Sequence, residues 1–352
     1  MWNRRIVRLA ALALCTLVGG AVSASAQARY KATQTGDIVE LRDARTDVVV
    51  NVLTTASNAY QMTVKGEDVI RRTWASIDEI RPRMGLSGIP LLWPYANRLD
   101  EQAFYANGQK YSFDLGLGNT GRGTVPIHGF LQNTAAWKVV EAKADATSAW
   151  IISRLEFFRI PAYMKQFPFA HTLTMTYRLQ DGALEVRTRI ENQSAEPMPV
   201  AIGFHPYFQL TDSSREDWYL SVAAKTHWLL DGRTIPTGET EPITRLLPDP
   251  KNVAVKDVTL DDIFTDLERD TNGLATMTLK GKRQQIDVVL GPKFKTILVL
   301  SRVGGRPSVA FEPMAGISNS MNLAHRGLYK ELQTVASGGS WEESFWIRPK
   351  GY

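Results

Sequence analysis

Apolar and polar residues alternate with a period of two along several stretches of the chain. The clearest alternation covers residues 184–191, where apolar residues or threonine take the even positions and charged residues the odd ones. This is the period of a strand with one buried face. Residues 173–179 have the composition of a second strand, and Asp181-Gly182 between the two segments is typical of a hairpin turn. We therefore predict an antiparallel hairpin here.

Strand signals recur over the rest of the chain, whereas helical periodicity is nearly absent. Only Trp74, Ile77 and Ile80 have the spacing of a helix, just before Pro82. Many short strands separated by turn residues predict an all-β fold, a large antiparallel β-sandwich. The pattern alone does not choose between a twisted super-sandwich and a jelly roll. The further strands are predicted at Val48–Val52, Trp137–Ala142, Trp150–Phe158, Thr276–Leu279, Ile286–Leu290, Thr296–Ser301, Ser308–Glu312 and within Gly338–Pro349.

The first 26 residues have the pattern of an export signal. Three arginines precede an apolar run from Leu9 to Val22, which is too short to favour a membrane span. Ala24-Ser25-Ala26 has the small residues of a cleavage site. We therefore expect a signal peptide over residues 1–26 and a single folded domain over 27–352. The cleaved protein would be periplasmic or secreted, without a stable membrane anchor. The alternative is that the leader stays uncleaved and anchors the chain.

Composition narrows the function. The net charge of +5 includes the three leader arginines, so the remaining chain carries +2, and no run of lysine and arginine indicates a nucleic-acid partner. Cys15 is the only cysteine and lies in the leader, so the mature chain has no thiol nucleophile, disulfide or cysteine-based metal site. No metal-ligand spacing and no glycine-rich phosphate loop is present, so we expect no metal and no cofactor.

One histidine stands where an apolar strand meets a proline. Val200–Phe204 is apolar, and His205-Pro206 follows it directly, with Tyr207 and Phe208 next. Because proline biases the preceding residue toward extended geometry, the strand should end near His205, with the imidazole at the edge of a loop. An imidazole beside aromatic rings suits a polyhydroxylated ligand such as a sugar. A histidine that only ends the strand is the alternative.

Two earlier segments also bring polar groups to the ends of apolar runs. Gly88–Leu99 contains Asn97-Arg98, and the guanidinium is a fork of donors that stays protonated. In Val125–Gly129, His128 precedes a glycine, beside which a ligand could approach the backbone closely. A solvated arginine and a buried, fully hydrogen-bonded histidine are the respective alternatives.

Two later segments carry carboxylates. Thr259–Phe264 contains Asp261 and Asp262, either of which could hold a ligand or open an Asx turn. In Val309–Met314, Glu312 lies between an apolar strand and a proline. Partial burial there would raise the glutamate's pKa toward neutrality, whereas a surface acid at the strand end is the alternative.

These five segments, in this order, resemble the motifs of the aldose 1-epimerases, the galactose-mutarotase-like proteins. The resemblance covers roughly residues 85 to 349 and implies a twisted β super-sandwich, free sugar as the substrate and no cofactor. It implies Glu312 as the general base and His205 as the general acid, with His128 as the second active-site histidine. Gln209 replaces an asparagine found in many galactose-type relatives, which leaves the substrate sugar open.

The resemblance also implies that Arg98, Asn97 and Asp261 hold sugar hydroxyls, although the adjacent Asp262 leaves the register open by one residue. An asparagine that follows the base in the family matches Asn319 or Asn322. His171, His227 and His325 fall outside the motifs, and we interpret them as structural or surface residues.

Three other functions stay open at this point. The pocket could bind a carbohydrate without converting it. Arginines such as Arg81, Arg83 and Arg122 could serve a sugar-phosphate epimerase. Asp261 and Glu312 could be the carboxylates of a glycoside hydrolase. The sequence names neither the sugar, whose specificity we expect to rest on Ser213–Trp218 and Arg233–Glu241, nor the oligomeric state.

Overall fold

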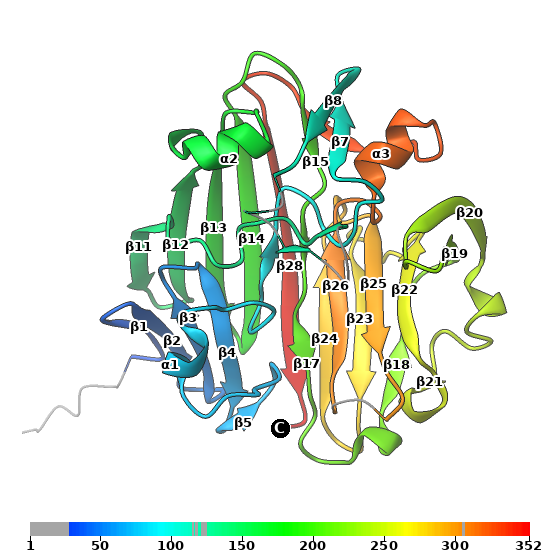
Figure 1. The fold of residues 1–352 in the computed structure, drawn as a ribbon. Coiled ribbons are helices and arrows are strands. Elements are labelled where there is room, and N and C mark those ends of the chain that lie inside the picture. The colour runs from blue at the N-terminus through cyan, green and yellow to red at the C-terminus, as the bar shows by residue number, and fades with distance from the viewer. Residues whose placement is uncertain (1–27, 115, 117–118, 121–124, 305–306) are drawn as a thin grey trace, which may run out of the picture.

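The computed structural model describes residues 28–352 except 115, 117–118, 121–124 and 305–306; the predicted signal peptide lies outside these residues. Three antiparallel sheets of five, nine and eight strands form most of the described chain (Figure 1). The prediction of a large antiparallel β super-sandwich is confirmed. No helix in the described part of the chain is long and apolar enough to cross a membrane.

The five-stranded sheet is a simple meander at the start of the described chain, in which each strand pairs with the next. Its strands are β1 (Tyr30–Thr35), β2 (Ile38–Asp43), β3 (Val48–Leu53), β4 (Asn58–Val64) and β5 (Glu67–Asp68).

The nine-stranded sheet is the largest, and its centre is the C-terminal strand, which joins a hairpin meander to later strands. In order across the sheet, its strands are β11 (Lys138–Ala144), β12 (Ala149–Glu156), β13 (His171–Gln180), β14 (Ala183–Asn192), β28 (Ser340–Lys350), β24 (Gln285–Leu290), β23 (Ala275–Lys280), β18 (Tyr219–Ser221) and β21 (Val253–Ala254).

The eight-stranded sheet carries the candidate residues. Its strands are, in order, β20 (Pro236–Pro242), β19 (Thr226–Leu230), β22 (Leu260–Thr265), β25 (Thr296–Ser301), β26 (Val309–Met314), β16 (Gly203–Phe204) and β6 (Leu91–Leu92), with β17 (Tyr207–Phe208) also pairing with β26.

Short elements complete the described chain. Three two-stranded ribbons pair β7 (Ala103–Ala106) with β8 (Gln109–Ser112), β9 (Asn119–Thr120) with β10 (Pro126–Ile127), and β15 (Met198–Val200) with β27 (Gln333–Val335). The α-helices are α1 (Ile77–Ile80), α2 (Pro161–Gln166) and α3 (Ser320–His325), and single 3-10 turns occur at Phe157–Arg159, Arg215–Asp217, Ile243–Arg245 and Val255–Asp257.

One face of the nine-stranded sheet packs against both other sheets. On β14 the even-numbered residues 184–190 are buried, as their alternation predicts. The N-terminal sheet contacts β11, β12 and β13, while Phe204 of the eight-stranded sheet packs on Phe345 of β28 with ring centroids 5.0 Å apart. One continuous apolar core therefore includes residues of all three sheets.

The predicted strands match observed strands, with corrections at their ends. The hairpin is β13 and β14, and Asp181 and Gly182 both have positive φ, as its tight turn needs. The strand predicted over Trp150–Phe158 ends at Glu156, because the chain turns into a 3-10 helix there. The helical spacing near Trp74 yields only the single turn α1.

The single strand predicted over Val200–Phe204 is wrong. It is split between β15, which pairs with β27, and β16, which pairs with β26 and β6. The chain changes partners at residues 201 and 202, and because all five residues are buried, their apolar character hides the change.

Candidate active site

The three segments that contain Arg98, His128 and His205 lie side by side because their backbones pair. The segment that follows β6 runs in the middle. Trp93 bridges to Gly129 on one side, and Tyr95 bridges to Ala201 on the other. The amide of His128 donates to the carbonyl of Asn97 at 2.8 Å. Residues separated by more than 100 positions thus meet through main-chain contacts.

The sheet register places His205 opposite Glu312. Gly203 pairs with Met314 and Tyr207 with Ala310, so the position between them on one strand faces the position between them on the other. His205 Nε2 lies 2.9 Å from Glu312 Oε1, and the side chains are only 4% and 1% exposed. A strand-end imidazole and a strand carboxyl therefore form one buried, hydrogen-bonded pair.

Burial shifts the pKa of Glu312. It raises the pKa of the Glu312 carboxyl above 4.5, while the adjacent His205 acts in the opposite direction, through its charge and its hydrogen bond. A carboxyl with a raised pKa can accept and return a proton near neutral pH more readily than a solvated one.

His128 stands beside this pair. Its ring meets that of His205 edge to face, with centroids 5.2 Å apart. Its backbone is left-handed at φ 62°, a rare conformation outside glycine. Burial lowers the pKa of His128 well below 6.5, and the charges of His205 and Arg98 lower it further. His128 is therefore neutral at pH 7 and can donate or accept one hydrogen bond without adding charge.

Each member of this trio has a buried polar atom with no hydrogen-bond partner among the described residues. These atoms are His128 Nδ1, His205 Nδ1 and Glu312 Oε2. An unsatisfied buried polar atom lowers the stability of the fold by about 1–3 kcal/mol, so a cluster of three is unusual in a purely structural role. They are the groups that a polar ligand would satisfy.

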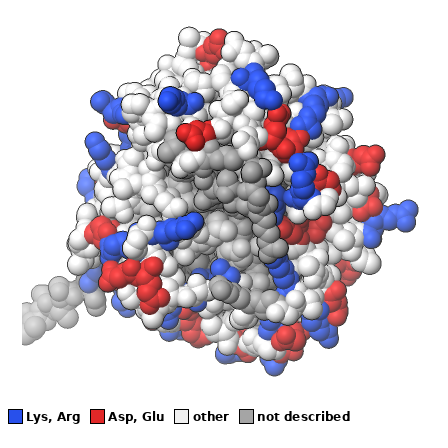
Figure 2. Space-filling model, viewed as in Figure 1, with Lys and Arg blue, Asp and Glu red and all other residues white. Residues whose placement is uncertain are grey.

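A cleft of about 840 Å³ opens next to the trio, and His128, Arg98 and Asp261 line it. Arg98 Nη2 lies 3.4 Å from Asp261 Oδ2, so the cation and the carboxylate hold each other at the wall. His205 and Glu312 are almost fully buried next to His128 and are not among the described residues that line the cleft. Figure 2 shows basic and acidic side chains scattered among uncharged residues on one face of the molecule.

The register also separates the two adjacent aspartates. Asp261 pairs with Leu300, and Leu300 pairs with Ala310. Ala310 and Glu312 are two positions apart on β26, so their side chains share one face of the sheet with Asp261. Asp262 points to the other face, where its Oδ1 is 3.0 Å from Nε2 of His227. Asp261 is therefore the cleft residue, and Asp262 belongs to a separate contact.

Asn97, which we predicted to hold a sugar hydroxyl, is almost fully buried. It is 2% exposed and has a left-handed backbone at φ 55°. Its Oδ1 accepts hydrogen bonds from the backbone amide of Arg98 at 2.8 Å and from Arg98 Nη1 at 3.0 Å. This geometry supports a positioning role, in which Asn97 fixes the guanidinium that lines the cleft.

The two asparagines after Glu312, Asn319 and Asn322, both form hydrogen bonds with Asp100, two residues after Arg98. Asn322 Nδ2 donates to Asp100 Oδ1 at 2.9 Å, and Asn319 Oδ1 accepts from the Asp100 amide at 3.3 Å. They tie α3 to this segment, and so support the Arg98 side of the cleft.

Several residues at the site carried no sequence motif. Arg302 follows β25 and reaches Asp261 Oδ2 at 3.6 Å, and Arg233 and Thr234 bring the turn between β19 and β20 to the cleft. The Arg233–Glu241 loop thus contributes lining residues. Arg81 instead pairs with Asp37 and Asp78, and Arg122 lies outside the described residues.

The histidines outside the motifs, which we predicted to be structural or surface residues, are not among the described residues that line the cleft. His171 is fully buried and accepts from Trp93 Nε1 at 3.0 Å, and burial lowers its pKa to about 3. His325 stacks on Tyr105 at the surface, with ring centroids 4.0 Å apart. In the part of the chain that the structure describes, no group of three histidine, cysteine or carboxylate residues could hold a metal ion.

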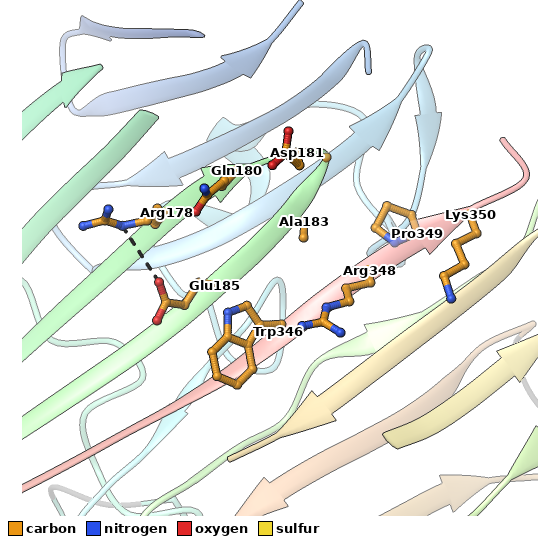
Figure 3. Close-up of a pocket in the computed structure, with 10 residues that line it drawn as sticks. Arg178, Gln180, Asp181, Ala183, Glu185, Trp346, Arg348, Pro349 and Lys350 are labelled. Atoms are coloured by element: carbon orange, nitrogen blue, oxygen red, sulfur yellow. Dashed lines mark ion pairs between the residues drawn. The ribbon is translucent and has the colours of Figure 1, made fainter. Parts of the chain in front are cut away.

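A second hollow, of about 450 Å³, lies on the outer face of the nine-stranded sheet (Figure 3). Arg178, Glu185 and Trp346 stand in one cross-strand row there, and Arg348 extends beside the indole. Glu185 is already engaged by Arg187 at 2.9 Å and by Ser344 Oγ at 2.8 Å. This hollow therefore lacks the unsatisfied acid and imidazole groups of the first cleft.

Comparison with known proteins gives one family and one fold. The model of the family described as aldose 1-epimerase matches residues 83–347. A galactose mutarotase-like protein from Clostridium acetobutylicum has a similar structure, with a TM-score of 0.78 and 21% sequence identity over 92% of this chain and 98% of that one. Galactose 1-epimerase from Lactobacillus acidophilus NCFM gives 0.70 and 14%, over 92% and 98%.

A third solved structure, a putative aldose 1-epimerase from Escherichia coli K12, has a TM-score of 0.67 at 15% identity and covers 87% of this chain and 97% of that one. The family match begins after the five-stranded sheet, whereas the structural matches span nearly the whole length of each relative.

Proposed function

Because this chain belongs to the aldose 1-epimerase family, we propose that it interconverts the α and β anomers of a free aldose by opening and reclosing the sugar ring. The observation that carries the proposal is the buried pair of His205 and Glu312, 2.9 Å apart, beside His128. The reaction needs one base, one acid and no cofactor, and this cluster offers a carboxyl and two imidazoles.

The proposed chemistry uses the free polar atoms of the cluster. Glu312 takes the proton of the anomeric hydroxyl at Oε2, and His205 donates a proton to the ring oxygen as the C1–O5 bond breaks. The C1–C2 bond then rotates. Closure on the other face returns both protons, so the enzyme ends in its starting state.

The cleft wall would position the sugar. Arg98 and Asp261 present donors and acceptors to hydroxyl groups, and Asn97 fixes the guanidinium. His128, neutral because its pKa is lowered, would hydrogen-bond the ring oxygen or steady the charge that develops there. We assign this supporting role to it, and not a second proton transfer.

Polarimetry tests the proposal. Freshly dissolved α-glucose, α-galactose, xylose and arabinose are followed as they approach anomeric equilibrium, with the enzyme and with its Glu312→Gln and His205→Asn variants. We expect at least one sugar to equilibrate faster with the enzyme, and each variant to lose about 10²–10⁴-fold of that acceleration. Near-full acceleration by either folded variant would contradict the assigned roles.

A binding protein that does not convert its ligand is the second candidate. The buried acid–imidazole pair argues against it, because holding hydroxyl groups does not require a carboxyl with a raised pKa. Sugar binding without faster equilibration would favour this candidate. We also propose that the reaction takes place outside the cytoplasm, on the basis of the leader alone; cell fractionation of the full-length chain tests this.

A further inference from the structure

The cleft wall has an excess of positive charge. Among the described residues that line it, the charged ones are Arg83, Arg98, Arg233 and Arg302, against the one carboxylate of Asp261. These arginines come from four separate segments of the chain: the loop after α1, the segment after β6, the turn between β19 and β20, and the end of β25. Cations gathered on one wall of a cleft attract an anionic ligand more strongly than a neutral one.

The one carboxylate is already shared between two cations. Arg98 Nη2 and Arg302 Nη2 lie 3.4 and 3.6 Å from the same oxygen, Asp261 Oδ2. The Arg302 side chain lines the cleft and is 59% exposed. A guanidinium has five donors, and among the described residues the 3.6 Å contact with Asp261 is the one ion pair of Arg302, so it has donors to offer a ligand.

The other two arginines differ in their partners. Arg233 is held by Asp231 at 3.1 Å, and its Nη1 donates to the carbonyl of Asp100 at 3.3 Å. Arg83 is exposed and, among the residues that the structure describes, forms no ion pair. Arg83 and Arg302 are therefore the two arginines of the wall whose charge is least compensated.

We propose that the physiological substrate is an aldose that carries an anionic group, a carboxylate or a phosphate, and that Arg83 and Arg302 supply the charge that selects it. This inference rests on the proposed function of the same cleft. A guanidinium fork matches the oxygens of both anions, and several cations in a hollow raise the local concentration of an anionic ligand. The hydroxyl groups remain with Arg98 and Asp261.

Rates of anomer exchange, measured by NMR on equilibrated sugars, test the inference in matched pairs. Galacturonate and glucose 6-phosphate are compared with galactose and glucose, each at low and high ionic strength. We expect kcat/KM to be about tenfold higher for at least one anionic sugar than for its neutral parent, and this advantage to shrink in high salt because salt screens exposed charges. The carboxylate and phosphate arms show which anion is preferred.

Three variants locate the selectivity. Arg83→Gln and Arg302→Gln should each lower the anionic-to-neutral ratio severalfold, with the loss mainly in KM. The matched control is Arg348→Gln, which removes an exposed arginine from the outer sheet face beside Trp346, far from the cleft wall in sequence and outside its lining (Figure 3). It should leave the ratio unchanged.

Two failures are distinguishable. If neutral sugars exchange as fast as their anionic counterparts or faster, the inference is overturned while the proposed function stands. If no sugar exchanges faster than it does without enzyme, the proposed function fails. Calorimetry with galacturonate and galactose then decides the inference, which is supported by tighter galacturonate binding that depends on Arg302 and overturned by equal affinities.

Discussion

At the residue scale, the pKa of Glu312 links the structure to activity. Burial raises this pKa above 4.5, and His205 partly offsets the effect. A general base works only when ionised, so kcat/KM should fall as pH drops through the raised pKa. We expect an acid limb with a midpoint above pH 4.5 in the pH–rate profile of the enzyme.

The His205→Gln variant provides the matching test. Because His205 lowers the pKa of Glu312, its removal should move the acid limb of the residual activity to higher pH. An acid limb at or below pH 4.5 in the enzyme, or one that does not move in the variant, would argue against Glu312 as the base.

The sequence could predict the residues of the site better than their geometry. His205, Glu312 and Arg98 follow apolar runs in recognisable motifs, whereas the choice between Asp261 and Asp262 needs the strand register. Arg302 is an exposed arginine after a strand, and nothing local distinguishes it from any solvated arginine. Asn97 belongs to a motif, but its contact with Arg98 shows only in three dimensions.

At the element scale, Gly129 lets two segments of the site approach each other. It has φ 62°, and a Cβ atom placed on it would lie 2.0 Å from the carbonyl oxygen of Trp93. We expect Gly129→Ala to lower the free energy of unfolding by about 3 kcal/mol or more, because the clash adds to backbone strain. Chemical denaturation measures this.

Gly36→Ala is the control for that prediction. Gly36 has a similar φ of 59°, but nothing lies within 4 Å of its added Cβ atom. Gly36→Ala should lower the free energy of unfolding by about 1 kcal/mol, which is the backbone strain alone. Equal losses in the two variants would show that close packing at Gly129 does not matter.

His227 should stabilise the β19–β20 hairpin, whose turn carries Arg233 into the cleft. Its ring lies 3.0 Å from both Glu241 Oε1 and Asp262 Oδ1. Burial lowers the pKa of His227, but its bonds to Asp262 and Glu241 outweigh this and raise the pKa above 6.5. The stabilisation is therefore complete below pH 6.5 and is lost as pH rises through the folded-state pKa.

Denaturation across pH checks this contribution. His227→Gln should lower the free energy of unfolding by about 1 kcal/mol near pH 6, with a smaller difference toward pH 9. His325→Gln, which removes a surface histidine stacked on Tyr105, should show no such trend. A His227→Gln effect that grows with pH would have the wrong sign.

Element prediction from the sequence succeeded where strands are long. The β13–β14 hairpin and the Thr296–Ser301 strand were found because six or more residues show a clear pattern. The strands β6, β16 and β17 have two residues each, too few for any period, and β16 and β17 flank His205. The split of the 200–204 run was hidden because each of its residues is buried.

At the scale of the whole molecule, the continuous core predicts one cooperative unfolding transition. Asp43 ties the N-terminal sheet to the β13–β14 turn. Its side chain is 0% exposed, pairs with Arg29 at 2.8 Å and accepts from the Gly182 amide at 3.1 Å. We expect Asp43→Ala to lower the free energy of unfolding by about 2 kcal/mol, because it leaves buried donors unpaired.

Two probes of thermal unfolding test the cooperativity. Near-ultraviolet circular dichroism follows the aromatic core, and limited proteolysis follows the N-terminal sheet. Both should report the same midpoint in the enzyme and a common lower midpoint in Asp43→Ala. Separate loss of the N-terminal sheet would show that residues 27–352 are not a single folding unit.

The most direct test of the central claim is a crystal structure of the Glu312→Gln variant with a bound aldose. The account predicts the anomeric hydroxyl within hydrogen-bond distance of residue 312, and the ring oxygen within reach of His205 or His128. A sugar bound with its C1 end turned away from these three side chains, or seated only in the outer hollow beside Trp346, would contradict it.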